Sequence, residues 1–182
     1  MAFTPADVYK LPFESDSFDI VHAQQLLGHL ADPVTAVREM VRVAKPGGVV
    51  ALRECDLFTF AIAPPTPELE RCLELMLWQV EVGPGVANGG RTTKKWCLEA
   101  GVQADRLKCS AGTWCYSSRE EREARAIPWM GRITSSELAT KAVEKGKATK
   151  EELEGIAKAW ERWMDCEEAW LAVMHGQVLI RV

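Results

Sequence analysis

The sequence lacks long apolar segments and a strong charge of one sign. It contains no run of about 18 apolar residues, the length that crosses a membrane, and its start lacks a basic stretch followed by an apolar one. Its formal net charge is −4, with acidic and basic residues interspersed. This gives no electrostatic reason to expect nucleic acid or an anionic membrane as a partner. We therefore expect a cytoplasmic protein.

The spacing patterns of metal and disulfide sites are also missing. The six cysteines are scattered without C-x-x-C or Cys/His spacing, which favours reduced thiols in a core over disulfides or zinc ligands. Asp, Asn and His residues do not occur at the spacing of a metal-binding loop, so the sequence predicts no metal ion. Its 182 residues, 47% hydrophobic and 26% charged, suffice for a globular domain with a core.

Two short apolar segments with a helix between them organise the first part of the chain. Phe18–Ala23 (FDIVHA) and Val49–Leu52 (VVAL) are typical of strands that are covered on both faces, so His22 is expected in the core. Asp32-Pro33 predicts the start of the helix, and Lys45-Pro46-Gly47-Gly48 predicts its end. Such closely connected elements favour a parallel pair with a right-handed crossover, hence an α/β domain.

The remaining segments are predicted to form both helices and strands. We expect a candidate strand over Met1–Ala6, a helix opened by Thr66-Pro67, a helix over Arg91–Ala100, a strand over Arg106–Tyr116, a charged helical insertion over 117–166 and a last strand over Val178–Val182. Candidate capping boxes for the insertion are Ser117-x-x-Glu120, Ser118-x-x-Glu121 and Thr149-x-x-Glu152.

The order of several motifs resembles a known family. ADVYKLPFESDSFDIVHAQQLLGHLADP followed by REMVRVAKPGGVVALRE is similar to the second half of a class I S-adenosylmethionine-dependent methyltransferase, in particular to the ubiquinone- and menaquinone-biosynthesis group. The order is an acidic residue, LPF, a D-S-F-D strand start, a helix, then K-P-G-G before the next strand. The resemblance implies the C-terminal part of a Rossmann-like α/β fold with an antiparallel last strand.

The Gly-rich cofactor motif of that family has no counterpart in the sequence. Gly83-Pro84-Gly85 and Asn88-Gly89-Gly90 are rich in glycine, but neither follows an apolar strand and opens a helix as the motif requires. The resemblance therefore implies that 1–182 form a single truncated methyltransferase-like domain, incomplete for cofactor binding as a lone chain. It also implies a helical lid over 117–166. The alternative is that these helices cover an exposed sheet.

The same resemblance predicts an unpaired sheet edge. Without the family's first strands, Phe18–Ala23 becomes an edge strand, and an apolar edge favours pairing with another chain. We therefore expect a homodimer, or an exchange of elements across the exposed edge and face of the sheet.

By resemblance, four residues contact the cofactor S-adenosylmethionine. Asp7 corresponds to the acidic residue that accepts a hydrogen bond from the adenine amino group, and Val8 supplies its backbone N–H to the same ring. Ala23 and Gln24 correspond to the stretch that lines the methionine part. The alternative for Asp7 is a carboxylate that caps its own loop.

Methyl transfer from a sulfonium is an in-line displacement, so the protein positions two reactants and removes a proton from an oxygen or nitrogen acceptor. His29, beside the expected mouth of the active site, is the first candidate base, and His175, before the last strand, is the second. Arg53 and Glu54 end a strand on the carboxyl side, where open α/β sheets bind ligands. They and Trp78 are candidate substrate contacts. Alternatively, Arg53 and Glu54 pair with each other and with the lid.

Two functions remain open from the sequence. The first is methyl transfer from S-adenosylmethionine to a small-molecule acceptor. The alternative is a degenerate methyltransferase fold that acts as a non-methylating binding or scaffold protein, because a fold does not fix a function. The sequence names neither the acceptor nor the methylated atom.

Overall fold

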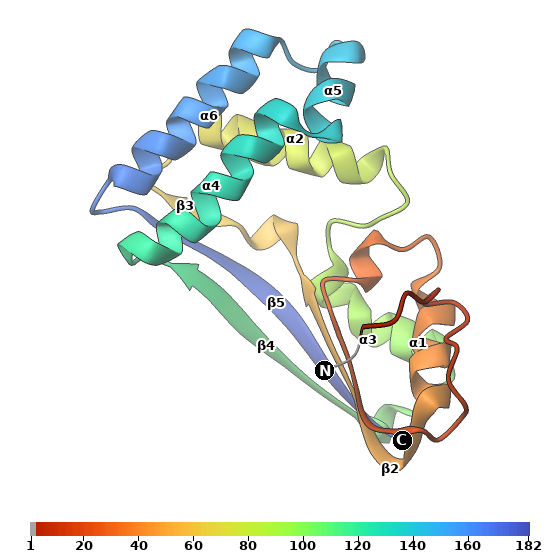
Figure 1. Ribbon diagram of the computed structural model, residues 1–182. Coiled ribbons are helices and arrows are strands. Elements are labelled where there is room, and N and C mark those ends of the chain that lie inside the picture. The colour runs from red at the N-terminus through yellow and green to blue at the C-terminus, as the bar shows by residue number, and fades with distance from the viewer. Residues whose placement is uncertain (1–2) are drawn as a thin grey trace. The chain divides into compact units, whose positions relative to one another are not determined.

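The computed structural model describes residues 3–182, which form a mixed α/β fold (Figure 1). The strands are β1 (Phe18–Gln24), β2 (Ala44–Cys55), β3 (Ala61–Ala63), β4 (Leu107–Tyr116) and β5 (Trp170–Arg181). The helices are α1 (Pro33–Val43), α2 (Pro67–Glu81), α3 (Gly89–Glu99), α4 (Arg119–Ser135), α5 (Glu137–Glu144) and α6 (Lys150–Asp165). The α/β fold expected from the sequence is confirmed.

Contacts within the chain define two compact units. The first, here called the sheet unit, comprises Met1–Phe58, Pro84–Thr113 and Met174–Val182. The second, the helical unit, comprises Thr59–Gly83 and Trp114–Val173. Each unit is described by itself.

The sheet unit is built on a parallel strand pair, as the sequence predicts. β1 pairs with β2 in parallel, and their register brings Gln24 opposite Arg53. β2 also pairs with the second half of β5, which runs antiparallel and brings His175 opposite Cys55. β4 pairs with β5 as well. The antiparallel last strand implied by the family resemblance is therefore confirmed.

The helix between the parallel strands begins where its capping chemistry predicts. The Asp32 carboxylate accepts the backbone N–H of Thr35 at 3.0 Å, and Pro33 occupies the first turn. The apolar face of α1 packs with α3 and the strands in one core. This core contains Ala23, Leu27, Ala36, Val37, Met40, Ala44, Val50, Leu52, Trp96, Cys97, Val178 and Ile180.

The strand after α1 is longer than its apolar run suggests. β2 begins at Ala44, so the Lys45-Pro46-Gly47-Gly48 segment both ends the helix and forms part of the strand. The end of the chain lies alongside this segment: Gly47 donates its N–H to the Val182 carbonyl at 2.8 Å, and Val182 donates to the Gly48 carbonyl at 3.0 Å. Gly47 has a φ of +81°, a conformation that glycine adopts without strain.

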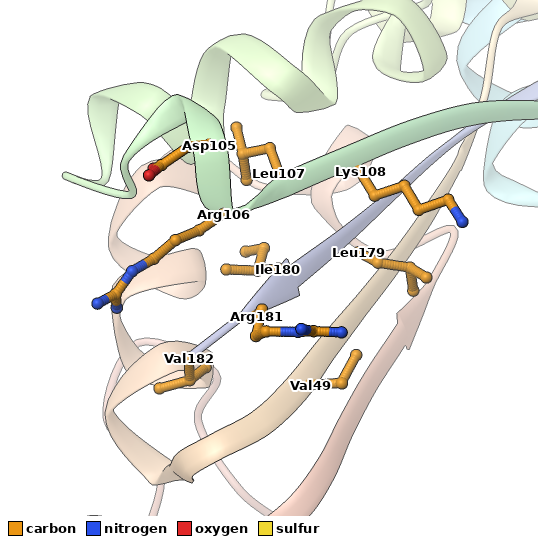
Figure 2. A pocket seen from close by; sticks show the side chains of 9 residues that line it. All are labelled: Val49, Asp105, Arg106, Leu107, Lys108, Leu179, Ile180, Arg181 and Val182. Carbon is orange, nitrogen blue, oxygen red and sulfur yellow. The ribbon is translucent and has the colours of Figure 1, made fainter.

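The two faces of the sheet unit differ in exposure. Side chains alternate along a strand, and the face away from the core carries Ile20 and Leu179, which are 69% and 44% exposed. His22 is exposed on this face too, so its predicted place in the core is wrong, and the strands are not covered on both faces. A shallow hollow of about 390 Å³ lies here, and Figure 2 shows Val49, Leu179 and Arg181 among the residues that line it.

The helical unit contains the predicted insertion. α4, α5 and α6 fill most of 117–166, and Figure 1 shows them together with α2. Capping boxes start α4 and α6, formed by Ser118 with Glu121 and by Thr149 with Glu152, so the Ser117 alternative is wrong. Buried Arg122 donates to the Met164 carbonyl at 3.0 Å and thereby ties α4 to the end of α6. β3 pairs antiparallel with the first residues of β5.

The predicted strand over Met1–Ala6 is absent from residues 3–6, and residues 1–2 lie outside the described part of the chain. Among the described residues, no helix is both long enough and apolar enough to cross a membrane.

Candidate active site

Polar groups gather at the carboxyl edge of the parallel strands in the sheet unit. β1 and β2 both end there, and α1 begins there because it follows β1. The Tyr9 hydroxyl accepts the N–H of Asp32, just before α1, at 3.3 Å. This bond places the segment with Asp7 and Val8 at the same edge. Open α/β sheets bind their ligands at this edge.

The four residues predicted to contact the cofactor all belong to the sheet unit. Asp7 is exposed, and one of its carboxylate oxygens accepts the N–H of Tyr9 at 2.9 Å. The predicted loop-capping bond therefore forms, and an exposed carboxylate has further lone pairs to accept a ligand donor. Ala23 has its side chain in the core, so it can offer only its backbone, whereas Gln24 is exposed.

Glu54 fixes the loop that follows β1. Its side chain is buried, with 2% exposed, and its two carboxylate oxygens accept three consecutive backbone N–H groups, from Leu26 at 2.9 Å, Leu27 at 2.8 Å and Gly28 at 3.2 Å. Hydrogen bonds to an ionised group are stronger than neutral ones. Glu54 therefore holds the short 3₁₀ turn Leu27–His29, with His29 exposed at its end.

Arg53 precedes Glu54 in β2, so the two side chains face opposite sides of the sheet. The half-buried Arg53 side chain lies on the face away from the core, near Gly112 of β4. Side chains on opposite faces are not oriented toward each other, and the alternative that Arg53 and Glu54 pair with each other and with the lid stays a prediction.

His175 lies inside the sheet unit. It is 0% exposed on β5, and its Nε2 lies 3.1 Å from Nε2 of Gln25. Gln25 has a φ of +50°, which is unusual for a residue other than glycine, and its N–H donates to the Arg53 carbonyl at 2.8 Å. The structure therefore brings both candidate bases to the carboxyl edge, with His29 exposed and His175 buried.

An ion pair that the sequence analysis did not predict lies just after the end of β2. Arg91, at the start of α3, makes two hydrogen bonds to the fully buried Asp56 carboxylate, one of them 2.9 Å long. These bonds hold the pKa of Arg91 above its ordinary value. The guanidinium carbon also lies 5.8 Å from the centre of the Phe58 ring. The sequence signal for this ion pair was Asp56, an acidic residue one position after the end of β2.

The Gly-rich loops serve close packing at this edge. A Cβ on Gly176 of β5 would collide with the backbone of Gly90 in α3, and a Cβ on Gly85 would collide with the Gly28 carbonyl. Val86 also donates its N–H to that carbonyl at 2.9 Å. These glycines therefore let α3 and the loop before it approach the strands and the 3₁₀ turn.

The other predicted substrate contact, Trp78, is half-buried in α2 of the helical unit. Over residues 3–182, no group of three His, Cys, Asp or Glu residues is placed to hold a metal ion.

The residues at the carboxyl edge fit parts of S-adenosylmethionine. Asp7 offers an exposed carboxylate to a donor such as the adenine amino group. Gln24 offers an exposed amide, which can both donate and accept. The backbone N–H groups of residues 26–28 are occupied by Glu54 and are not free for a ligand.

Comparisons of the sequence with known proteins find methyltransferases. Residues 1–52 match the family model described as a methyltransferase domain. An uncharacterized methyltransferase of Schizosaccharomyces pombe is 30% identical over 99% of this chain, which spans 64% of that relative's length. A demethylmenaquinone methyltransferase of Clavibacter sepedonicus is 36% identical, over 41% of this chain and 28% of that relative.

A solved structure from Bacillus halodurans, assigned as a candidate methyltransferase, shares the fold. Its TM-score is 0.51 at 15% identity, and the match covers 98% of this chain and 76% of that one. Residues 1–52 are therefore similar to a methyltransferase domain, and the chain is similar to methyltransferases in its sequence and in its fold.

Proposed function

We propose that this chain carries out methyl transfer from S-adenosylmethionine to a small-molecule acceptor at the carboxyl edge of β1 and β2. The family resemblance predicts instead a cofactor site that is incomplete in the lone chain, and titration of the unmodified chain with the cofactor decides between the two. The observation that supports the proposal most is the arrangement at that edge, where Asp7, Gln24 and His29 are exposed next to a loop fixed by Glu54. A protein of this family uses such an edge to position two reactants, which supplies much of the rate enhancement.

In this proposal Asp7 and Val8 hold the adenine ring, the first through its carboxylate and the second through its backbone N–H. Gln24 and the backbone of Ala23 line the methionine part. When bound, S-adenosylmethionine would supply a methyl group on a positively charged sulfur. A lone pair of the acceptor would attack the methyl carbon, and the sulfur would leave as a neutral thioether. Such a displacement depends on the alignment of the two reactants and not on a covalent bond to the protein. These residues therefore act by orienting the methyl donor.

We assign the role of base to His29 and a positioning role to His175. His29 is exposed at the end of the turn that Glu54 holds, so an acceptor can reach its ring. His175 is buried against Gln25, so an acceptor cannot reach it without breaking that contact. Arg53 remains a candidate contact for a polar group of the acceptor.

Photochemical crosslinking tests the location of the cofactor site. The chain is irradiated with S-adenosylmethionine that carries a radioactive methyl group, digested, and the labelled peptides are identified by mass spectrometry. We expect label in peptides that contain residues 7–10 or 22–29, and less label when excess S-adenosylhomocysteine is present. Label confined to α4, α5 and α6, or label that the competitor does not reduce, would contradict the proposal.

We also propose that two copies of the chain associate across β1. Support comes from Phe18 and Ile20, which are 36% and 69% exposed on this strand, since an apolar edge strand favours pairing with another chain. Sedimentation equilibrium at micromolar concentration should show a dimer, and Ile20→Lys should dissociate it. Ile127→Lys, at a 55% exposed position on α4, is the matched control. A monomeric parent chain would refute this association.

A further inference from the structure

A pocket in the helical unit is not used by the proposed methyl transfer. It has a volume of about 320 Å³ and lies between α2, the segment 60–65 and Trp160 of α6. All the residues that line it belong to the helical unit. Its volume is at the lower end of the range for small-molecule sites, about 300–1,000 Å³.

The floor of the pocket is fixed by core packing. Leu69, Cys72 and Met76 of α2 are at most 7% exposed, and Trp160 is 2% exposed. The Trp160 indole donates its N–H to the Cys72 sulfur at 3.4 Å, and its ring stacks on Trp129 with centroids 6.4 Å apart. The orientation of Trp160 is therefore set before any ligand enters.

The floor is apolar and polarisable as well as fixed. Burial raises the pKa of the Cys72 thiol to about 11, so the sulfur is neutral at physiological pH. Cys72, Met76 and Trp160 thus present two sulfur atoms and an indole. Sulfur atoms and aromatic faces make favourable contacts with aromatic rings.

The rim of the pocket is open, and one of the residues that line it is charged. Phe60 and Ile62 are half-buried and Ala61 is exposed, so a ligand can pass between them. The Arg125 guanidinium, which is not among the residues that line the pocket, lies 5.1 Å from the centre of the Phe60 ring, a cation–π contact. Glu70 is exposed and is the one charged residue among those that line the pocket. A carboxylate at the mouth repels anions.

We propose that the helical unit binds a small aromatic molecule without negative charge in this pocket. The aromatic body rests on Trp160, Cys72 and Met76, and a donor or positive group faces Glu70. This inference goes beyond the proposed methyl transfer, because it requires neither S-adenosylmethionine nor the carboxyl edge of the sheet unit.

Two dyes that share one aromatic body test the ligand class. N-phenyl-1-naphthylamine is neutral, and 8-anilinonaphthalene-1-sulfonate adds a sulfonate to the same rings. Fluorescence titration of the full chain should give a dissociation constant about tenfold lower for the neutral dye, and Glu70→Gln should reduce that ratio by weakening the repulsion. Equal binding of both dyes, or a ratio unchanged by Glu70→Gln, would overturn the assignment.

Two further measurements locate the bound dye. Ala61→Phe places a ring at the pocket mouth and should weaken binding of the neutral dye about tenfold, whereas Ile127→Phe, exposed on α4 outside the pocket, should leave it unchanged. In the unmodified chain, titration with the neutral dye should shift the NMR signal of the Met76 methyl group and leave that of Met40, in the sheet unit, in place. Unchanged binding in Ala61→Phe would overturn the proposal. An unshifted Met76 signal would overturn it as well, and that measurement uses the unmodified chain, so it does not depend on whether a variant folds.

Discussion

Gln25 and His175 lie with their Nε2 atoms 3.1 Å apart, although 150 positions separate them in the chain. The contact joins the residue after β1 to β5 and spans β2, which pairs with both strands. His175 has no exposed surface. The His175 ring therefore packs against Gln25 at the carboxyl edge, whereas the His29 ring is exposed to solvent.

The first prediction separates the two histidines. His175→Ala should lower the free energy of unfolding by about 2–4 kcal/mol, because it leaves a cavity in the core and the Gln25 amide without this partner. His29→Ala should change it by less than about 0.5 kcal/mol, as is usual for an exposed residue. Urea unfolding followed by circular dichroism measures both.

The activity of the same variants gives the second half of this test. With S-adenosylmethionine and a panel of phenol and amine acceptors, His29→Ala should reduce formation of S-adenosylhomocysteine about 10²-fold, the lower range for losing a general base. Its affinity for S-adenosylhomocysteine should stay that of the parent. Full turnover in His29→Ala would remove this residue from the reaction.

The second prediction concerns Glu54. In Glu54→Gln, the amide has one acceptor oxygen and sets an NH₂ group against the N–H groups of residues 26–28, so the variant should lose about 2–4 kcal/mol of stability. Cofactor affinity should fall with it, because the turn that follows Gln24 loosens. Glu81→Gln, at an exposed position on α2, serves as the control, and equal stability of the two variants would show that Glu54 does not hold the turn.

The third prediction concerns Asp7. Asp7→Asn retains an oxygen that can accept the Tyr9 N–H and removes only the negative charge. The affinity for S-adenosylhomocysteine should therefore fall about tenfold, the equivalent of one charge-assisted hydrogen bond, while stability stays constant. Calorimetric titration measures the affinity. Asp105→Asn, also exposed and outside the candidate site, should bind like the parent, and no difference between the two variants would exclude Asp7.

Much of the fold could be predicted, because its signals are local. Asp32-Pro33 marks the start of α1 through a cap that needs only neighbouring residues, and the two apolar runs lie within the two parallel strands. The beginning of β2 at Ala44 could not be predicted in this way. Gly47 and Gly48, in its first half, form hydrogen bonds with Val182, a contact that local propensity does not encode.

The burial of individual residues was harder to predict than the elements themselves. A strand with apolar residues on both faces has the same sequence pattern whether one face or both faces are covered. His22 was therefore expected in the core, but it is exposed. The contact of Gln25 with His175 and the ion pair of Asp56 with Arg91 join distant segments. The resemblance selected residues at the carboxyl edge, but their roles remain predictions.

The fourth prediction concerns the start of α6 and its pH dependence. A hydrogen bond from Arg71 holds the pKa of Glu152 below its ordinary 4.5. The stability that the carboxylate adds is therefore present above that value and is lost as pH falls through the lower folded-state pKa. Glu152→Gln should therefore destabilise by about 1 kcal/mol at pH 7, from the weakened cap and the lost ion pair. The difference should shrink as the pH falls below the ordinary pKa of Glu152, because the carboxylate then becomes protonated in the folded chain.

Thermal unfolding across this pH range provides the test, with Glu154→Gln, exposed on the same helix, as the control. A deficit for Glu152→Gln that is constant from acid to neutral pH would mean that the charge of Glu152 contributes nothing.

Calorimetric titration of the unmodified chain with S-adenosylmethionine and S-adenosylhomocysteine tests the central claim most directly, because it asks whether the carboxyl edge of β1 and β2 holds the cofactor. We expect one site per chain with a micromolar dissociation constant, about −8 kcal/mol, and tenfold weaker binding in Asp7→Asn. Absence of heat up to millimolar ligand, or binding that Asp7→Asn and Glu54→Gln both leave unchanged, would contradict it.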